Sequence, residues 1–314
     1  MELNTTSVID SLCKDIRRVI ADTLKKRGAV VGISGGIDSS VVAALCAKAL
    51  GKDRVVGLAL PEKDSSSESQ SLAENLANKL GIEFQVENIT KGLEGMGAYT
   101  RRDEAIQRVF GNYRSGMEFK ITLQSDPMKK NILNTFQGTV TFPDGKEESL
   151  RLPLKEYMQI VAASNMKQRL RMTMLYYHAE ARNYAVAGTG NKNEHELGFF
   201  VKYGDGGADL KPIIHLYKTQ VYQLAKALGI PREIIERIPT TDTYPGEVTQ
   251  EEFFFRLPFN TMDEIWEYHE NQVSVHDIAA KMNISPEQAQ RIVNDIDTKR
   301  KNTEYLRMEP LAVQ

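Results

Sequence analysis

The chain has 314 residues, of which 41% are hydrophobic and 26% charged, a composition typical of a globular protein rather than a disordered one. Its 40 lysines and arginines nearly balance 42 aspartates and glutamates, so the net charge of −2 gives no reason to expect nucleic acid as a partner. We expect a cytoplasmic protein with no membrane partner, because Cys13 and Cys46 form no metal or redox motif, no apolar signal segment opens the chain and no run is long enough to span a bilayer.

In chain order, the first predicted element is a helix over about residues 8–24, where apolar residues recur at the spacing of one helix face. A buried strand over 30–33 then runs into a turn that contains Gly35 and Gly36. An almost wholly apolar helix begins at about Val41. The order is strand, tight glycine turn and helix N-terminus.

This turn predicts an anion site, because the first N–H groups of a helix lack intrahelical partners and glycines let the backbone bend around a phosphate. Hydroxyl groups of Ser34, Ser39 and Ser40 add donors, and Asp38 offers the oxygen ligand that Mg²⁺ on a phosphate needs. The turn is not a Walker A loop, because no lysine follows its last glycine, and it lacks the third glycine of the dinucleotide fingerprint.

Strands and helices then alternate along the chain. We expect strands at about 54–61, 82–89 and 184–190, a helix that ends at Leu80, and a fifth strand at 211–214. Repeated strand–helix–strand units predict an α/β fold with a doubly wound parallel sheet, in which ligands bind at the carboxyl ends of the strands.

Residues 111–153 break this pattern. The segments 119–123 and 138–142 predict strands, and 142–146 predicts a hairpin turn. We expect an inserted β-element there, which is a lid, a partner surface or a decoration without function. Helical periodicity returns over 154–182.

The most polar part of the chain follows the strand at 184–190. Residues 191–196 predict a polar loop, and the three glycines and two aspartates of 204–209 require a backbone shaped by turns. The remaining predicted helices lie at 217–228, 262–270 and 286–300. We therefore expect one domain over 1–314 with a helical C-terminal part at 260–305.

The piece 278–285 is similar to the first helix and turn of a helix-turn-helix reader. The helical stretch that follows, over 286–297, holds Glu287, Asp295 and Asp297 against Arg291 alone, a poor surface for phosphates. A DNA-binding or non-catalytic role through the C-terminal helices is therefore a weak alternative.

Two motifs carry a resemblance to a known family. The pattern Ser-Gly-Gly-x-Asp-Ser at 34–39 is similar to the pyrophosphate loop of the ATP pyrophosphatase superfamily, whose members cleave ATP between its α- and β-phosphates. The segment from Gly198 through Asp209 is more specific, and with it the chain resembles ammonia-dependent NAD synthetases over nearly its whole length. The resemblance implies a five-stranded, doubly wound parallel sheet of the Rossmann-like, adenine nucleotide α-hydrolase type. It also implies a homodimer with the dinucleotide site at the subunit interface.

The resemblance implies roles for the matching residues. The ATP phosphates would be held by the loop residues Gly32, Ile33, Ser34, Gly35, Gly36, Ile37, Asp38 and Ser39. The ATP molecule would also touch Thr189, Lys218 and Thr240, and the Mg²⁺ ligands would be Asp38 and Glu194. The contacts to deamido-NAD would come from Arg169, Lys202, Asp209 and the pair Thr298-Lys299, which stands where the family usually has His-Lys. Since Arg171 lies two residues from Arg169, only one of the two can point at the site.

The implied reaction joins a carboxylate to ammonia. The carboxylate of deamido-NAD attacks the α-phosphorus of ATP, pyrophosphate leaves, and ammonia displaces AMP from the acyl-adenylate. No protein nucleophile is needed, so catalysis rests on in-line positioning and on charge neutralisation by Mg²⁺, Lys218 and the loop amides, with Asp38 and Glu194 holding the metal. Neither cysteine lies in a nucleophile context, so the nitrogen comes from free ammonia or from a separate glutamine amidotransferase.

Three departures from the family pattern lie on the acceptor side. Residues 245–252 replace a characteristic acidic loop and precede Phe253-Phe254-Phe255, Thr298 replaces a histidine, and 111–153 is inserted ahead of Arg169. ATP-dependent adenylation is therefore the firmer expectation. The alternative is a related amide ligase that acts on another carboxylic acid with ammonia from a partner amidotransferase.

Overall fold

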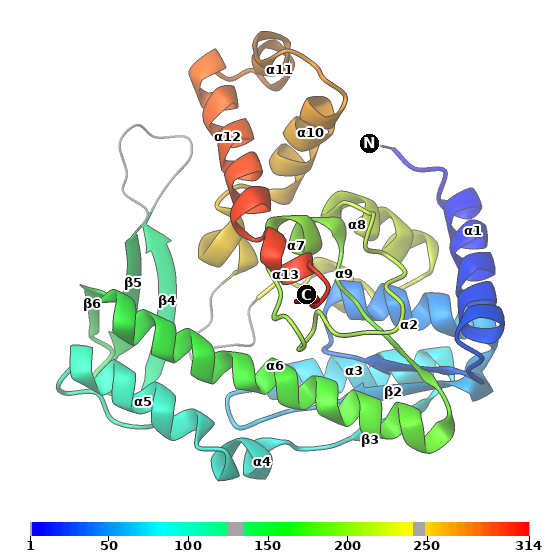
Figure 1. Ribbon diagram of the computed structural model, residues 1–314, viewed down its shortest axis with the longest axis horizontal. Helices are drawn as coiled ribbons and strands as arrows, with labels where there is room; N and C mark the ends of the chain where they lie inside the picture. Colours follow the sequence, from blue (N-terminus) through cyan, green and yellow to red (C-terminus); the bar gives the residue numbers. More distant parts are fainter. Residues whose placement is uncertain (1, 125–134, 241–248, 314) are drawn as a thin grey trace.

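The computed structural model (Figure 1) describes residues 2–124, 135–240 and 249–313. Its larger sheet is parallel and has four strands. The strands are ordered β3-β2-β1-β7, with bounds β1 Ala29–Gly32, β2 Val55–Ala59, β3 Glu83–Val86 and β7 Ala185–Ala187. In the central strand, Val30 pairs with Val56 on one side and Val186 on the other. The prediction of an α/β fold with a parallel sheet is confirmed.

The fifth strand predicted at 211–214 was wrong, because the described residues of this sheet form four strands. Leu210 makes a single parallel bridge with Ala187, and residues 212–215 form turns. Pro212 has no N–H group to donate to a neighbouring strand, so the ladder ends at this bridge.

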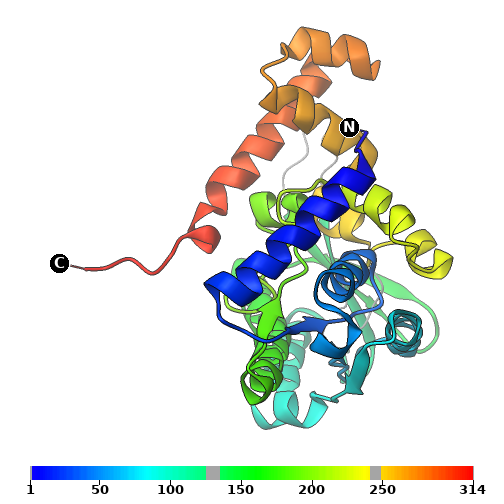
Figure 2. The same cartoon turned by 90° about the vertical axis from the view of Figure 1, so that its right-hand side faces the viewer.

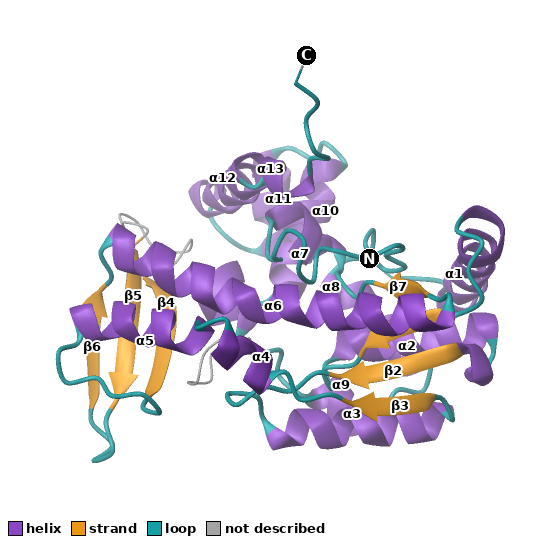
Figure 3. Cartoon of the chain, turned by 60° about the horizontal axis from the view of Figure 1, so that its bottom comes forward, coloured by secondary structure: helices purple, strands orange, loops and turns teal. Residues whose placement is uncertain are grey.

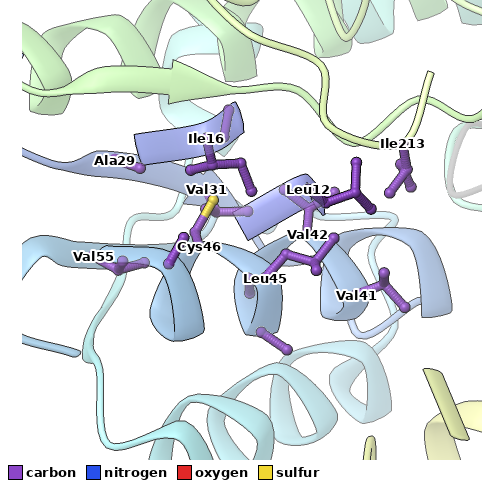
Figure 4. Packing of buried hydrophobic residues seen from close by; sticks show 14 of the residues in the cluster. Leu12, Ile16, Ala29, Val31, Val41, Val42, Leu45, Cys46, Val55 and Ile213 are labelled. Atoms are coloured by element: carbon purple, nitrogen blue, oxygen red, sulfur yellow. The ribbon is translucent and has the colours of Figure 1, made fainter. Parts of the chain in front are cut away.

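One face of the sheet is covered by helices from both halves of the chain. They are α1 Thr5–Arg18 with its π-helical extension η1 Val19–Thr23, α2 Ile37–Leu50 with the short η2 Lys52–Arg54, α3 Ser67–Leu80, α8 Lys218–Ala227 and α9 Arg232–Glu236. Figure 4 shows Val31 of β1 among Leu12 and Ile16 of α1 and Val42 of α2. Since α2 is buried on nearly all sides, its apolar sequence is explained by its place in this core.

The opposite face is covered by α4 Thr90–Gly95, α5 Ala98–Val109 and α6 Leu154–Arg182. Val30 packs there with Leu93, Tyr99 and Ala179, whereas the next residue, Val31, belongs to the first core. This alternation is that of a strand buried on both faces. The doubly wound arrangement is therefore confirmed, and the 29-residue helix α6 has the predicted bounds.

Beyond the sheet, α6 also supports an antiparallel β-element made of β4 Glu118–Gln124, β5 Thr135–Thr141 and β6 Glu147–Arg151. Figure 3 shows the two sheets at opposite ends of α6. Phe119, Ile121 and Val140 pack with Ile160 of α6 in a separate apolar core. The expected β-element is confirmed and has a third strand after the hairpin turn; residues 125–134 of the expected insertion lie outside the described residues.

The C-terminal helices form a further layer beside α7 and α8 (Figure 1). They are η3 Glu251–Phe255, α10 Phe259–Glu270, α11 Val275–Met282, α12 Pro286–Asn302 and α13 Glu304–Arg307. Their apolar core surrounds Trp266, and Figure 2 shows the chain beyond α13 extending away from the body. Across the three described ranges, no helix is long and apolar enough to cross a membrane.

A buried ion network joins the segment after β2 to α5 and α6. The Lys167 ammonium lies 2.9 Å from Glu62 and 2.8 Å from Asp64, and Arg102 lies 2.5 Å from Asp64. Burial would raise the pKa of Asp64, but the charges of Lys167 and Arg102 outweigh this and hold it below its ordinary value. The network fixes the segment after β2 at the carboxyl edge of the sheet.

We predict that Lys167→Ala lowers the free energy of unfolding by about 3–5 kcal/mol, because it removes one cation from a buried cluster of carboxylates. Urea unfolding followed by circular dichroism measures the change. Lys155→Ala, at an exposed position of the same helix, is the control and should change it by less than about 0.5 kcal/mol. Equal stabilities of the two variants would contradict the prediction.

Candidate functional site

The loop between β1 and α2 is held in one shape by its own serines. The Ser39 hydroxyl accepts from the Ser34 N–H at 3.2 Å and donates to the Gly36 carbonyl at 3.0 Å, and Ser40 donates to the same carbonyl at 2.8 Å. Gly35 has a φ of +74°, and a Cβ atom there would lie 2.5 Å from the Ser69 carbonyl oxygen. The loop is therefore held in one shape in front of the N-terminus of α2, whose unpaired N–H groups suit an anion.

Three helix N-termini bring charged side chains together at this loop. Asp38 of α2 accepts a hydrogen bond from the Asn191 amide at 2.9 Å and forms an ion pair with Lys218 of α8. Lys218 is only 1% exposed. Glu194 is the third residue of α7 (Lys192–Leu197), which follows β7. The prediction that 191–196 forms a loop was wrong, because Asn191 and Glu194 form a capping box that starts this helix.

The charged groups of the site shift the pKa values of Glu194 and Lys218. Burial and the nearby Asp38 carboxylate raise the pKa of Glu194 to about 8. Burial would lower the pKa of Lys218, but the carboxylates of Asp38 and Glu194 outweigh it and raise the value. Burial and the Asp38 charge therefore both favour the protonated form of the Glu194 carboxyl group.

A cavity of about 160 Å³ opens onto these charges. It is lined by predicted ATP-site residues from the loop and from later segments, namely Ser34, Gly36, Ile37, Asp38, Ser39, Thr189, Glu194, Lys218 and Thr240. Gly32 and Ile33 line a second cavity instead, and Gly35 is turned against Ser69. The structure thus brings together residues from segments far apart in the sequence.

The second cavity, of about 460 Å³, adjoins the first and shares Ser34, Thr189 and Glu194 with it. Its other walls come from the carboxyl end of β2 at Leu58–Pro61, from α6, and from aromatic residues. The aromatic residues are Tyr157, Phe199, Phe200, Phe253 and Phe254. A polar cavity joined to a larger aromatic one suits a phosphorylated ligand with planar rings.

The residues predicted to contact the acceptor do not line either cavity within the described part of the chain. Arg169 donates to the Lys202 carbonyl at 3.3 Å, and the Lys202 ammonium donates to the carbonyls of Tyr305 and Met308 at 2.9 and 2.7 Å. Asp209 accepts from the Val186 N–H at 2.8 Å. These three residues lie beside the cavities rather than inside them.

The pair Thr298-Lys299 belongs to α12. Thr298 is exposed, and Lys299 donates to the Phe254 carbonyl at 2.9 Å and pairs with Asp295 at 2.9 Å. Burial lowers the pKa of Lys299 to about 8. Lys299 therefore anchors the aromatic segment that ends in Phe255. Residues 245–248 of the departing segment lie outside the described residues, and Thr249 forms a bridge with Thr240.

Sequence reasoning missed two side chains of the site, Asn191 and Gln250, and named a third, Arg171, only as the alternative to Arg169. Arg171 lines the larger cavity and donates to the Leu60 carbonyl at 3.1 Å, so of the two neighbouring arginines it is the one that faces the cavity. Asn191 contacts Asp38, and its spacing from Glu194 is the capping-box signal that the sequence offered. Gln250 lines both cavities and had no sequence signal.

The donor set fits a magnesium ion that arrives with phosphates. Mg²⁺ is bound in proteins through one or two carboxylates, with phosphate and water oxygens as the other ligands. Asp38 is near enough to Glu194 for its charge to raise the pKa of Glu194, and within the described ranges no group of three or more His, Cys, Asp or Glu residues could hold a metal ion. The two carboxylates fit a shared ion and not a site that is complete without phosphate.

We predict that Glu194→Gln raises the unfolding temperature of the metal-free protein at pH 9 and changes it much less at pH 4. Because the folded-state pKa is about 8 against an ordinary 4.5, the folded state binds this proton more tightly and the wild type loses stability as pH rises through that window. Glutamine cannot ionise and keeps an acceptor for the Asn191 N–H. Thermal scans in a chelator measure the effect, with the exposed Glu233→Gln as control. A pH-independent difference would contradict it.

Known proteins similar to this chain show the family to which it belongs. The family model for NAD synthase matches residues 8–135 and 144–310. The chain is 46% identical over 311 residues to the NH(3)-dependent NAD(+) synthetase of Mesorhizobium japonicum, and the match covers 99% of the chain and 97% of that protein. The protein of the same name from Rhizobium meliloti is 47% identical over 292 residues, with coverages of 93% and 87%.

Two solved structures share the fold. The NMN synthetase of Francisella tularensis has a TM-score of 0.68 at 22% identity, with 99% of both chains covered. The NH3-dependent NAD synthetase of Campylobacter jejuni has a TM-score of 0.64 at 21% identity, with coverages of 99% and 100%. From the family match and the rhizobial relatives together, the chain belongs to the NAD synthase family.

Proposed function

We propose that this protein is an ammonia-dependent NAD synthetase, which adenylates the carboxylate of deamido-NAD with ATP and amidates it with ammonia. The observation that carries the proposal is the convergence of Asp38, Glu194 and Lys218 on the anion-binding N-terminus of α2. The relatives at 46% and 47% identity bear the same activity in their names.

Each residue of the site has a role that follows from its position. The N–H groups at the start of α2 and the Ser34 and Ser39 hydroxyls bind the ATP phosphates. Asp38 and Glu194 would hold Mg²⁺, which supplies positive charge to the leaving pyrophosphate. When the nucleotide enters, Lys218 exchanges part of its contact with Asp38 for a phosphate oxygen and neutralises charge that grows as the Pα–O bond breaks.

The acceptor carboxylate must approach the α-phosphorus opposite the leaving pyrophosphate. The larger cavity adjoins the phosphate site on one side, so one of its walls is in position to hold the nucleotide base or the acceptor. Arg171 is a cation in that wall, and Arg169, Lys202, Asp209 and Thr298-Lys299 stay proposed contacts to deamido-NAD.

A homodimer would explain why those contacts lie outside the cavities of one chain. Leu154 is 72% exposed and Met158 60% exposed one turn further along α6, and Tyr177 on the same helix is 61% exposed. Exposed apolar residues on a long helix favour burial against a partner. We infer that a second copy packs on α6 and completes the acceptor site.

The state of the two cysteines bears on the source of the ammonia and on the cellular compartment. Cys13 and Cys46 are buried free thiols, and burial raises the pKa of Cys46 to about 12, so neither is an activated nucleophile for releasing ammonia from glutamine. We infer that free ammonia is the donor and that the protein works in the cytoplasm. A separate glutamine amidotransferase is the alternative source.

We predict that the protein converts deamido-NAD to NAD with ATP, Mg²⁺ and ammonium, forming AMP and pyrophosphate in equal amounts. Asp38→Ala should lower the rate by at least about 100-fold, because the site loses a metal ligand and the partner of Lys218. Coupled pyrophosphate and NAD assays measure this. Asp53→Ala, at an exposed position of η2, is the control and should keep the wild-type rate.

The same assay identifies the carboxylic acid that the protein amidates. Pyrophosphate release with nicotinate mononucleotide or another acid, and none with deamido-NAD, would overturn NAD synthesis and favour an amide ligase for that acid. Pyrophosphate release that survives Asp38→Ala would overturn the site.

We predict that Leu154→Glu combined with Met158→Glu converts a dimer into a monomer, because the charges cannot be buried in an apolar interface. Light scattering after gel filtration gives the mass, and circular dichroism checks the fold. Lys52→Glu, at an exposed position just after α2, is the control. A wild type that is monomeric at all concentrations would contradict the dimer.

A further inference from the structure

A buried carboxylate lies behind the charged site and lines neither cavity. Asp263 of α10 is 0% exposed. Its Oδ1 accepts from the Asn193 side-chain amide, and its Oδ2 accepts from the Thr219 N–H at 2.9 Å. Thr219 is the second residue of α8, so the carboxylate satisfies one of the N–H groups that a helix start leaves unpaired.

Asn193 connects Asp263 to Lys218 through hydrogen bonds of its side-chain amide. It is also 0% exposed, and its Oδ1 accepts from the backbone N–H of Lys218 at 2.9 Å. Both oxygens of Asp263 accept hydrogen bonds, so the N–H₂ end of the Asn193 amide faces Asp263 and the amide oxygen is left for Lys218. Three hydrogen bonds therefore join α10, α7 and the start of α8.

The joined segments carry the charged groups of the site. Asn193 directly precedes Glu194, and Lys218 is the residue whose ammonium pairs with Asp38. Displacing Asn193 would therefore move both Glu194 and Lys218 relative to Asp38. An apolar contact could hold the three helices together, but it would not set the rotation of α7 against α8.

A second set of contacts from the C-terminal helices acts on the same two segments. Glu270 of α10 accepts from Lys192 at 2.5 Å and from the Tyr217 hydroxyl at 2.6 Å. Arg300 of α12 pairs with Glu196 at 3.0 Å. The C-terminal layer thus holds both ends of α7 and the N-cap of α8.

We propose that Asp263 is a positioning residue for the ATP site, which acts through Asn193 to hold Lys218 and Glu194 in register with Asp38. This inference rests on the proposed function, because it takes Asp38, Glu194 and Lys218 as the groups that bind Mg²⁺-ATP. It assigns α10 a part in adenylation although none of its described residues lines either cavity.

The test is a reciprocal exchange. Asp263→Asn places an amide N–H₂ against one of the two donors, the Asn193 amide or the Thr219 N–H. Asn193→Asp places two carboxylates against each other. Each single variant therefore breaks the chain of hydrogen bonds. The double variant, Asp263→Asn with Asn193→Asp, restores all three. Its new amide at position 263 donates to the new carboxylate at position 193 and accepts from the Thr219 N–H, and that carboxylate accepts from the Lys218 N–H. We expect each single variant to lower kcat by about 10- to 100-fold, and the double variant to recover to within about threefold of wild type.

Three readouts separate positioning from stability. Pyrophosphate release gives kcat and the KM for ATP, thermal scans give the unfolding temperature, and calorimetry gives the affinity for Mg²⁺-ATP. The fluorescence of Trp266, the only tryptophan of the chain, reports the α8 start, since its ring lies 5.5 Å from that of Tyr217. The control is Glu264→Gln. Glu264 is next to Asp263 in the sequence, and its carboxylate accepts from Tyr268 of the same helix. The kcat of this variant should stay within about twofold of wild type.

The outcomes decide the proposal. Single variants that fold and keep wild-type kcat would overturn it, even with a lowered unfolding temperature. A double variant that is unfolded, or folded but no better than the worse single variant, would also overturn it. If the wild type releases no pyrophosphate with any acid, the proposed function fails by itself, and the same loss and recovery must then appear in the affinity for Mg²⁺-ATP.

Discussion

The ion pair between Asp38 and Lys218 is the contact on which the site depends. Lys218 is almost completely buried, and an unpaired ammonium there would carry a large desolvation cost. The pair therefore fixes the start of α8 against the start of α2. Glu194 adds a second carboxyl group, and burial together with the Asp38 charge raises its pKa. In the proposed function, Mg²⁺ would add positive charge beside these two carboxyl groups.

The backbone supports this arrangement. The side chains come from the first turns of α2, α7 and α8, and the capping box of Asn191 and Glu194 starts a six-residue helix that would be too short to form by propensity alone. Asn191 serves both purposes, since it caps α7 and contacts Asp38. The side chain that caps α7 therefore also holds a carboxylate of the charged site in place.

Sequence reasoning succeeded where a local pattern is long or specific. The bounds of α6 followed from its periodicity, and the loop at 34–39 led to Asp38 because its flanking strand and helix are local. It failed where tertiary contacts decide. The strand expected at 211–214 ends at one bridge, α7 looked like a loop, and Asp263 gave no signal because its partners are 44 and 70 residues away. In the proposed homodimer, the acceptor contacts would depend on how two chains assemble, which periodicity does not encode.

Helix α6 belongs to two apolar cores at once. Ile160 packs with the β-element, and Ala179 packs with the central sheet, within one helix that contains neither proline nor glycine. Such a helix offers no natural break. Loss of either core would expose part of α6 and withdraw support from the other. The β-element and the nucleotide-binding sheet should therefore melt as one cooperative unit, so that the added element extends the protein without creating an independently folding module.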